Sequence, residues 1–341
     1  MEARANPPRI LPGSDPAAIE EAAARIRAGE AVAFPTETVY GLGANALDPI
    51  AAARIFEIKE RPAFDPLIVH LADPTALAEI VRPEALADPR LRALAERFWP
   101  GPLTVVLPKR PAVPGIVTAG LDTVGVRVPD HPVARALIRA AGVPIAAPSA
   151  NRFGRVSPTR AEHVARQLGG RIGLILDGGP CRIGVESTVL LLAAERAVLL
   201  RPGGTPLEDI EAVVGPVAIP ADDAEARSLS PGRAESHYAP RARVLLAAPE
   251  ATPRARPGER LGLLAASEEG RRAAEAVGGP FVAVEVLSPA GDPVEAAARL
   301  FDALHTLDAA DLDGIVAQPV PEVGLGRAIM DRLRRAAGAT R

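Results

Sequence analysis

Helix-forming and strand-forming segments alternate along most of this chain, and this alternation constrains the fold more than any other feature. Three predicted helices, over 16–29, 53–58 and 77–81, follow the same signal, a capping Asp and then a Pro, at Asp15, Asp48 and Asp73. Apolar segments between and after them predict short strands, many of which end in Pro. These strands cover 31–36, 66–71, 103–108, 124–129, 143–148, 173–177, 187–192 and 197–202. The pattern predicts an α/β fold with one large twisted sheet whose loops converge at one edge.

A second, smaller α/β domain is predicted at the C-terminal end. After a helix at 207–214, residues 216–242 have few apolar side chains and many turn formers, which indicates a linker. Beyond the linker, strands and helices alternate again. The predicted strands cover 244–248, 261–266, 281–287 and 314–318, and the helices 268–276, 294–307 and 328–337. Because one core seldom grows past about 250–300 residues, we expect 341 residues to form a domain over 12–215, the linker, and a doubly wound, Rossmann-like domain over 243–341.

Composition excludes several classes of protein. The longest apolar run, Val189–Ala194, is far shorter than the ~20 residues of a membrane helix, and the first residues lack the apolar segment of a secretory signal. We therefore expect a soluble, cytoplasmic protein. The single cysteine, Cys181, excludes a disulfide framework, a cysteine-based zinc site and an iron–sulfur cluster. A net charge of −3 argues against tight binding to a nucleic-acid backbone, though not against a local basic groove.

Sequence motifs for two common kinds of site are absent. Neither the P-loop string G-x-x-x-x-G-K-[ST] nor the nucleophile elbow G-x-S-x-G occurs. Gly324 and Gly326 look like the start of a dinucleotide fingerprint, but Ile329 stands where its third glycine should be. A tight turn into a helix is the better interpretation.

Polar loops after the predicted strands are candidates for a ligand site. The loop over 34–45 offers the side chains of Thr36, Thr38, Tyr40 and Asn45, although an ordinary polar turn explains it equally well.

Two further loops carry groups that suit a phosphate. Lys59 and Arg61 suit a polyphosphate, and also the C-terminal end of a helix. Ser149 and Asn151 precede a helix whose predicted cap is Ser157, and a helix N-terminus is itself an anion site.

Charged and hydroxyl residues in or beside the predicted strands add to this pattern. Arg127 lies between valines, so it is costly to bury unless it meets an anion, either a ligand carboxylate or an internal Asp or Glu. His70 poses the same choice between a ligand and a structural role. Residues 186–188 begin one predicted strand, and Arg201 ends another. Together these residues indicate a site for a polyphosphate and a small polar substrate.

Nine strings, in order along nearly the whole chain, closely resemble the YrdC-like family of L-threonylcarbamoyladenylate synthases. They are FPTETVYGLGANA, IKERP, PLIVH, WPGPLT, TAGLDTVGVRVPDHP, APSAN, SPT, GVESTV and LLRPG. SPG…HYAP in the linker and the extra α/β domain resemble the family's long two-domain form. The resemblance implies a nucleotidyltransferase that converts L-threonine, bicarbonate and ATP into threonylcarbamoyl-AMP and pyrophosphate. That product feeds the threonylcarbamoyladenosine modification of tRNA.

The resemblance also implies roles for individual residues. Lys59 and Arg61 would be catalytic, and Mg²⁺ would arrive with ATP. L-Threonine would be held by Thr38, His70, Arg127, Ser187 and the backbone near Ala147. ATP would be held by Lys59, Arg61, Asp65, Thr123, Ser149, Asn151, Ser157, Arg201 and Tyr238. Asp65 departs from the family, in which many members have Asn or another neutral or basic residue that can face a phosphate.

Two questions stay open at this stage. Residues 230–240 could form a lid, with Tyr238 over the nucleotide and Arg233 near its phosphates, or a tether whose tyrosine packs on the second domain. The alternative functions are a carbamoyl-adenylate carbamoyltransferase and a non-catalytic RNA-binding module. The former carries cysteine-rich zinc segments, which a single cysteine excludes. The expected partners are proteins that transfer threonylcarbamoyl to tRNA, and direct contact with tRNA is not required.

Overall fold

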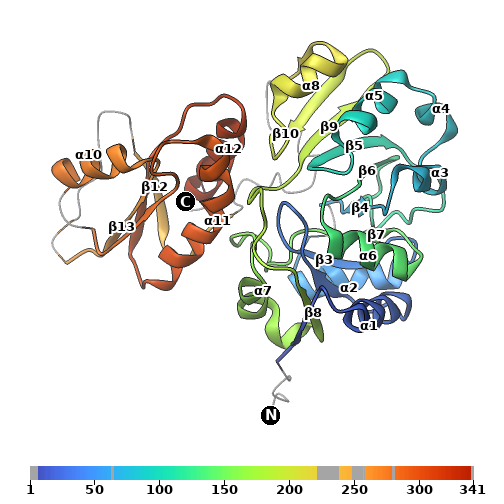
Figure 1. Ribbon diagram of the computed structural model, residues 1–341, viewed down its shortest axis with the longest axis horizontal. Coiled ribbons are helices and arrows are strands. Elements are labelled where there is room, and N and C mark those ends of the chain that lie inside the picture. Colours follow the sequence, from blue (N-terminus) through green and yellow to red (C-terminus); the bar gives the residue numbers. More distant parts are fainter. Residues whose placement is uncertain are drawn as a thin grey trace. The chain divides into compact units, whose positions relative to one another are not determined.

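The structure, a computed structural model, describes residues 7–62, 65–220, 238–247, 256, 258–278 and 281–338. The chain forms two compact units, coloured along the sequence in Figure 1. Unit 1 comprises residues 1–153, 158–182 and 186–233, and unit 2 comprises residues 154–157, 183–185 and 234–341. Two short internal segments therefore group with the C-terminal part of the chain, while the domain boundaries given above stay predictions.

Unit 1 is built on one mixed sheet of eleven strands, in the order β1-β8-β2-β3-β7-β4-β6-β5-β9-β10-β11. The strands are β1 (Arg9–Pro12), β2 (Val32–Phe34), β3 (Gly41–Asn45), β4 (Ile68–His70), β5 (Leu103–Pro108), β6 (Thr123–Arg127), β7 (Ile145–Ala146), β8 (Leu174–Asp177), β9 (Thr188–Leu192), β10 (Ala197–Arg201) and β11 (Val217–Ala218). The predicted large mixed sheet is confirmed. Its last strand, β11, lies inside the segment predicted as a linker.

Unit 1 contains the following helices, several of which begin at a predicted Asp-Pro signal. They are α1 (Pro16–Arg27), α2 (Pro49–Lys59), α3 (Leu77–Ile80), α4 (Pro83–Leu86), α5 (Pro89–Phe98), α6 (Pro132–Ala141), α7 (Ala161–Leu168) and α8 (Leu207–Val214), with 3₁₀ turns at Pro74–Ala76 and Gly169–Arg171. The carboxylates of Asp15, Asp48 and Asp73 each accept a hydrogen bond from the first turn that follows. Asp88 and His131 cap α5 and α6 in the same way, each before a proline.

The predicted helix cap at Ser157 is wrong. Helix α7 begins at Ala161, and Arg160 occupies the N-cap position, where its side chain does not cap the helix. The backbone just before α7 is fixed by the 34–45 loop instead, because the carbonyl of Pro158 accepts a hydrogen bond from the backbone N–H of Tyr40 at 2.8 Å.

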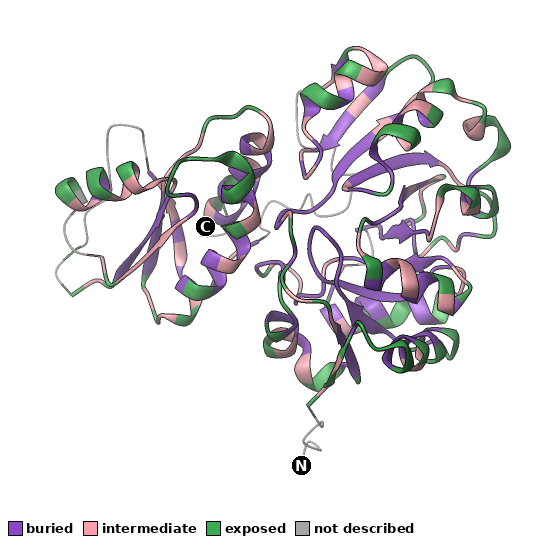
Figure 2. Cartoon of the chain, in the orientation of Figure 1, coloured by how far each residue is buried: buried purple, intermediate pink, exposed green. Residues whose placement is uncertain are grey.

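The two faces of the large sheet are covered differently. One face packs against α2, α5, α7 and α8 in the main core. On the other face, α1 and α6 cover β2, β7 and β8. Farther along that second face, Ile68, Val106, Val189 and Leu200 form a small apolar cluster made only of strand residues. Figure 2 shows that the strands are mostly buried, whereas the helices expose their outer sides.

Unit 2 contains a parallel sheet of four strands in the order β12-β15-β13-β14. Its elements are β12 (Arg243–Leu246), β13 (Leu261–Ala265), α10 (Glu268–Gly278), β14 (Ala283–Val286), α11 (Pro293–Ala309), β15 (Gly314–Ala317) and α12 (Leu325–Gly338). This confirms the predicted smaller α/β domain. Gly324, at φ +54°, turns the chain directly into α12, as the sequence indicated. Within the described ranges, no helix has the length and hydropathy to cross a membrane.

Candidate functional site

The sheet gathers predicted site residues on the face that carries the strand-only apolar cluster. Side chains alternate between the two faces of a strand, so His70 shares this face with Ile68 on β4. For the same reason, Thr123 and Arg127 lie on one face of β6. Strands β4 and β6 are parallel, and His70 is directly opposite Arg127 in their register. Two residues predicted from separate sequence strings are therefore neighbours.

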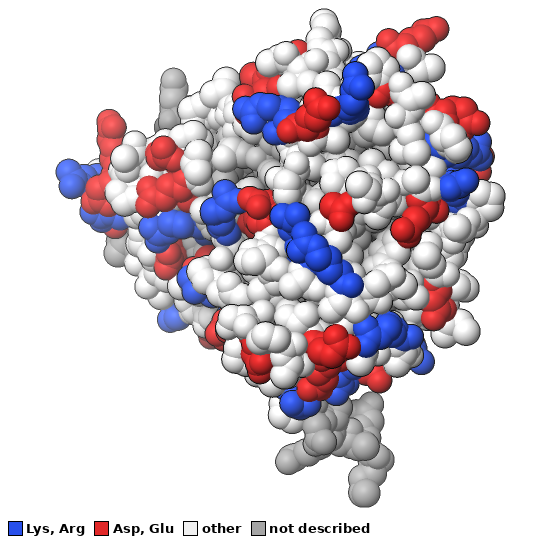
Figure 3. Space-filling model, turned by 45° about the vertical axis from the view of Figure 1, so that its right-hand side comes forward, with Lys and Arg blue, Asp and Glu red and all other residues white. Residues whose placement is uncertain are grey.

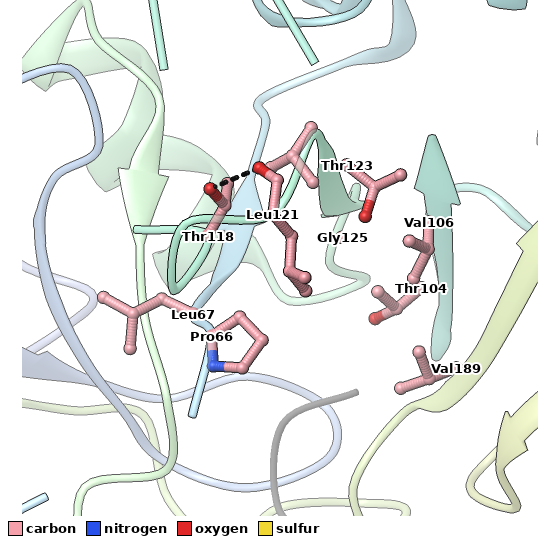
Figure 4. Close-up of a pocket in the computed structure, with 10 residues that line it drawn as sticks. Pro66, Leu67, Thr104, Val106, Thr118, Leu121, Thr123, Gly125 and Val189 are labelled. Carbon is pink, nitrogen blue, oxygen red and sulfur yellow. Dashed lines mark hydrogen bonds between the residues drawn. The ribbon is translucent and has the colours of Figure 1, made fainter. Parts of the chain in front are cut away.

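A pocket opens on this face (Figure 4). It is lined by Pro66, Leu67, Thr104, Val106, Thr118, Leu121, Thr123, Val124, Gly125 and Val189. Thr104 and Thr123 place hydroxyl groups beside apolar side chains, while the hydroxyl of Thr118 is used internally and donates to the carbonyl of Leu121 at 2.8 Å. At Gly125, a Cβ would lie only 3.2 Å from the side chain of Thr104. An apolar pocket with a few polar groups is typical of sites for small organic ligands.

Arg127 is buried and held by three groups of the protein. Its Nε donates to the carbonyl of Gly101 at 3.2 Å, and its Nη1 donates to Thr38 Oγ1 at 3.0 Å. Its Nη2 lies 2.5 Å from Oε1 of Glu37, in an ion pair between two buried side chains. The sequence motifs do not single out Glu37, although an internal Asp or Glu was one of the two predicted partners of Arg127. The useful signal was its position between two candidate threonines.

His70 is a buried, neutral imidazole. Its Nδ1 lies 3.2 Å from the carbonyl oxygen of Ile68, and its ring contacts that of Phe34 edge to face, with centroids 6.3 Å apart. Burial, and then the positive charge of Arg127, lower the pKa of His70 to about 3. A neutral imidazole has one donor and one acceptor nitrogen, so His70 can hydrogen-bond a hydroxyl or amine without adding charge.

The lowered pKa predicts that acid destabilises the protein through His70. Between pH 6.5 and pH 3 the unfolded chain binds a proton at this residue and the folded chain does not, so stability falls as the pH falls. Between pH 7 and pH 5 the wild type should lose roughly 2 kcal/mol more unfolding free energy than His70→Gln. Urea denaturation of both proteins at the two pH values measures this difference, and equal losses would contradict it.

Lys59 connects the end of α2 to the loop after β7. Its Nζ donates to the carbonyls of Ser149 and Asn151, at 2.5 Å each. The side chain is buried, and burial, followed by repulsion from Arg61, lowers its pKa well below the ordinary value. Lys59 is thus not an exposed cation at a helix end. It links the end of α2 to Ser149 and Asn151, two of the predicted ATP ligands.

Arg61 and Asp65 form a second buried ion pair. Arg61 Nη2 lies 2.8 Å from Asp65 Oδ2, and Arg61 also donates to the carbonyls of Asp65 and Pro66. This pairing gives Asp65 a partner of opposite charge. Asp65, the residue that departs from the family, therefore lies against the guanidinium of Arg61, a predicted ATP ligand.

Ser187 and Arg201 meet at the ends of β9 and β10. Arg201 Nη2 donates to both the carbonyl and the hydroxyl oxygen of Ser187, at 2.9 and 3.2 Å. The hydroxyl of Ser187 also lies 2.8 Å from that of Thr104, which lines the pocket. Ser187, which is predicted to bind L-threonine, and Arg201, which is predicted to bind ATP, are therefore in direct contact.

Two other residues of the 34–45 loop, Tyr40 and Asn45, have structural roles. The hydroxyl of Tyr40 donates to the carbonyl of Gly179 at 2.8 Å, and burial raises its pKa. Asn45 accepts a hydrogen bond from the backbone of Leu47, as in an ordinary turn. Of the other predicted residues in unit 1, Ala147 donates its N–H to Ile68, and Asn151 donates its amide to the carbonyl of Arg152.

Two predicted nucleotide ligands, Ser157 and Tyr238, belong to unit 2. Nε2 of His305 lies 3.1 Å from the carbonyl oxygen of Ser157. The ring of Tyr238 is buried and stacks on Phe301 with centroids 5.5 Å apart, and the guanidinium of Arg332 lies 5.3 Å from its centre. This packing is what the tether alternative expects. The rest of the predicted lid, residues 230–237 with Arg233, lies outside the described residues.

Fold and site define a class of protein. It is an α/β protein with buried cations and hydroxyls around a large mixed sheet, a neutral imidazole beside a buried arginine on one face of that sheet, and a Rossmann-like second unit. A family model described as "Telomere recombination", for Sua5, YciO and YrdC, matches residues 24–203, and the model for the threonylcarbamoyl-AMP synthase C-terminal domain matches residues 205–338. The chain belongs to the Sua5/YciO/YrdC family, in its two-domain form.

Known relatives match almost the whole chain. The threonylcarbamoyl-AMP synthase of Bacillus subtilis is 48% identical over 94% of this chain and 93% of its own. The synthase of Pyrococcus abyssi is 50% identical over 94% of each chain. The crystal structure of P. abyssi Sua5 complexed with L-threonine superposes with a TM-score of 0.84 at 43% identity and covers 95% of each chain.

Proposed function

We propose that this chain is a threonylcarbamoyl-AMP synthase that converts L-threonine, bicarbonate and ATP into threonylcarbamoyl-AMP and pyrophosphate. The observation that carries the proposal is the match to synthases of that name at about half identity over 94% of this chain. The reaction is a nucleotidyl transfer. Its product would pass, in the cytoplasm, to proteins that transfer threonylcarbamoyl to tRNA.

Arg127 is proposed to bind the carboxylate of L-threonine. A guanidinium has five N–H groups; the hydrogen bonds to Gly101 and Thr38 and the ion pair with Glu37 engage three of them, which leaves one on each terminal nitrogen. The terminal nitrogens can still bind a carboxylate in the two-point geometry that suits this pair of groups. His70, opposite Arg127 in the register of β4 and β6, would bind another polar group of the amino acid, together with Ser187 and the backbone near Ala147.

The buried cations are proposed to bind the phosphates of ATP. Lys59 and Arg61 come from the end of α2 and Arg201 from the end of β10, and each is almost fully buried. In surroundings with little water, such cations stabilise developing phosphate charge far better than they do in water. Thr123, Ser149 and Asn151 of the same unit would hold the rest of the nucleotide.

The chemistry requires positioning and charge stabilisation rather than a covalent nucleophile. The amine of L-threonine, once it has lost its proton, combines with bicarbonate to give a carbamate and water. A carbamate oxygen then attacks the α-phosphorus of ATP, a P–O bond forms, and pyrophosphate leaves. Mg²⁺ would come in with ATP as part of the substrate. Among the described residues, no three or more His, Cys, Asp and Glu side chains cluster as a metal site would need.

An RNA-binding module, the alternative function, would be expected to have a broad basic surface. On the face of the molecule in Figure 3, Lys and Arg side chains are interspersed with Asp and Glu. This agrees with the net charge of −3 and favours the enzyme.

The function predicts that pyrophosphate release from ATP requires both L-threonine and bicarbonate. Omission of either should reduce release to background, because the nucleophile that attacks ATP is the carbamate built from the two. Pyrophosphate release is measured with a coupled assay, and mass spectrometry identifies threonylcarbamoyl-AMP. Equal release without L-threonine would indicate a simple ATP pyrophosphatase and contradict the proposal.

A further inference from the structure

The hydroxyl groups of Thr36 and Thr38 form a hydrogen bond whose direction is fixed. Thr36 Oγ1 lies 2.7 Å from the carbonyl oxygen of Val39, and a carbonyl cannot donate, so this contact uses the only hydroxyl proton of Thr36. The 2.8 Å contact between Thr36 Oγ1 and Thr38 Oγ1 must then use the proton of Thr38. The backbone N–H groups of Thr38 and Val39 also point to Thr36 Oγ1, at the longer distances of 3.2 and 3.3 Å, and share its second lone pair.

Thr38 can therefore act only as an acceptor toward any further partner. Its proton is used by Thr36, and one of its two lone pairs accepts a hydrogen bond from Arg127 Nη1 at 3.0 Å. One lone pair is left. A ligand atom that binds there must carry a hydrogen, which excludes a carboxylate oxygen.

We propose that Thr36 is a positioning residue that orients Thr38 to accept a hydrogen bond from the α-amino group of the amino-acid substrate. This inference rests on the proposed function, in which the substrate carboxylate binds Arg127. The amino nitrogen is one bond closer to the carboxylate than the side-chain hydroxyl is, so it fits better beside a guanidinium that touches Thr38. A fixed acceptor would hold one N–H and leave the nitrogen lone pair free to attack the carbon of bicarbonate.

Thr36→Val tests the inference, because it removes the hydroxyl that takes the proton of Thr38. Thr38 would then be free to turn its own proton toward the ligand, where it opposes an N–H. We expect the Kd for L-threonine, measured by titration calorimetry, to rise about tenfold, and the KM for ATP to change less than about twofold. Thr36→Ser keeps the hydroxyl and should recover the affinity to within about threefold.

Thr205→Val is the matched control. Thr205 is buried in the same unit, and its hydroxyl makes no hydrogen bond to any residue that the structure describes. Its replacement should leave both constants at the wild-type values. A comparable loss in Thr205→Val would mean that any buried threonine in unit 1 is needed, which would overturn the inference.

Substrate analogues separate this role from a loss of loop structure. L-2-Aminobutyrate keeps the amine and lacks the hydroxyl, whereas (R)-3-hydroxybutyrate keeps the hydroxyl and lacks the amine. Thr36→Val should weaken the binding of L-2-aminobutyrate as much as that of L-threonine. The inhibition constant of 3-hydroxybutyrate should stay within about twofold of its wild-type value. If the binding of all three ligands weakens equally, or if only the ligands with the hydroxyl bind more weakly, the inference is wrong. A wild-type protein that makes no threonylcarbamoyl-AMP would instead refute the proposed function.

Discussion

Arg127→Met should destabilise the protein by about 3–5 kcal/mol and abolish L-threonine binding, because it leaves the buried carboxylate of Glu37 without its cation. No hydrogen bond to either oxygen of Glu37 is found among the described residues, so the guanidinium is its main compensation. The loss in kcat/KM should reach at least about a hundredfold, since two charge-assisted hydrogen bonds to the substrate carboxylate disappear. Urea denaturation measures the first effect, and calorimetric titration with L-threonine measures the second.

A double variant separates the two effects. Glu37→Met combined with Arg127→Met replaces both charges by apolar groups of similar size, and such replacements are often neutral for stability. We expect the double variant to recover most of the unfolding free energy and none of the threonine affinity. If Arg127→Met alone is as stable as the wild type, the ion pair is not the main support of Glu37. If the double variant binds L-threonine, Arg127 does not hold the carboxylate.

Local signals were enough to predict most of the fold. The Asp-Pro pairs mark the starts of α1 and α2 because both signals act within the first helical turn. Ser157 is a position where local signals give the wrong helix start. It has the composition of a cap, but the backbone at Pro158 is tied to Tyr40, more than a hundred residues away, and α7 starts later. A long-range contact of this kind leaves no local signal.

The candidate site shows the same division. The sequence strings identify Lys59, Arg127 and Ser187 as residue types suited to anions and amino acids. They do not show that Arg127 is already paired with Glu37, or that the hydrogen bond from Thr38 to Thr36 has one direction. The first depends on a contact between β6 and a loop far from it in the chain, and the second on the side-chain rotamers of neighbouring loop residues; a sequence string encodes neither.

Lys59→Met should reduce the rate of threonylcarbamoyl-AMP formation by at least about a hundredfold while the protein stays folded. The buried Nζ of Lys59 donates to the carbonyls of Ser149 and Asn151, and in the proposed site its protonated form also offsets phosphate charge. Because its pKa is lowered in the free protein, the approach of a triphosphate should raise that pKa and draw a proton from solution. We therefore expect proton uptake on ATP binding to be larger in the wild type than in Lys59→Met.

Lys109, the only other lysine, provides the control for this prediction. Its Nζ donates to one backbone carbonyl, that of Val113 at 2.7 Å, so Lys109→Met also removes a lysine-to-carbonyl hydrogen bond but touches no predicted ligand. Its activity and its proton uptake on ATP binding should equal those of the wild type. Proton uptake is measured by titration calorimetry in buffers of different ionisation enthalpy, and folding by circular dichroism. Wild-type turnover in folded Lys59→Met would show that this lysine only supports the loop, because a phosphate ligand cannot lose its charge without a loss of rate.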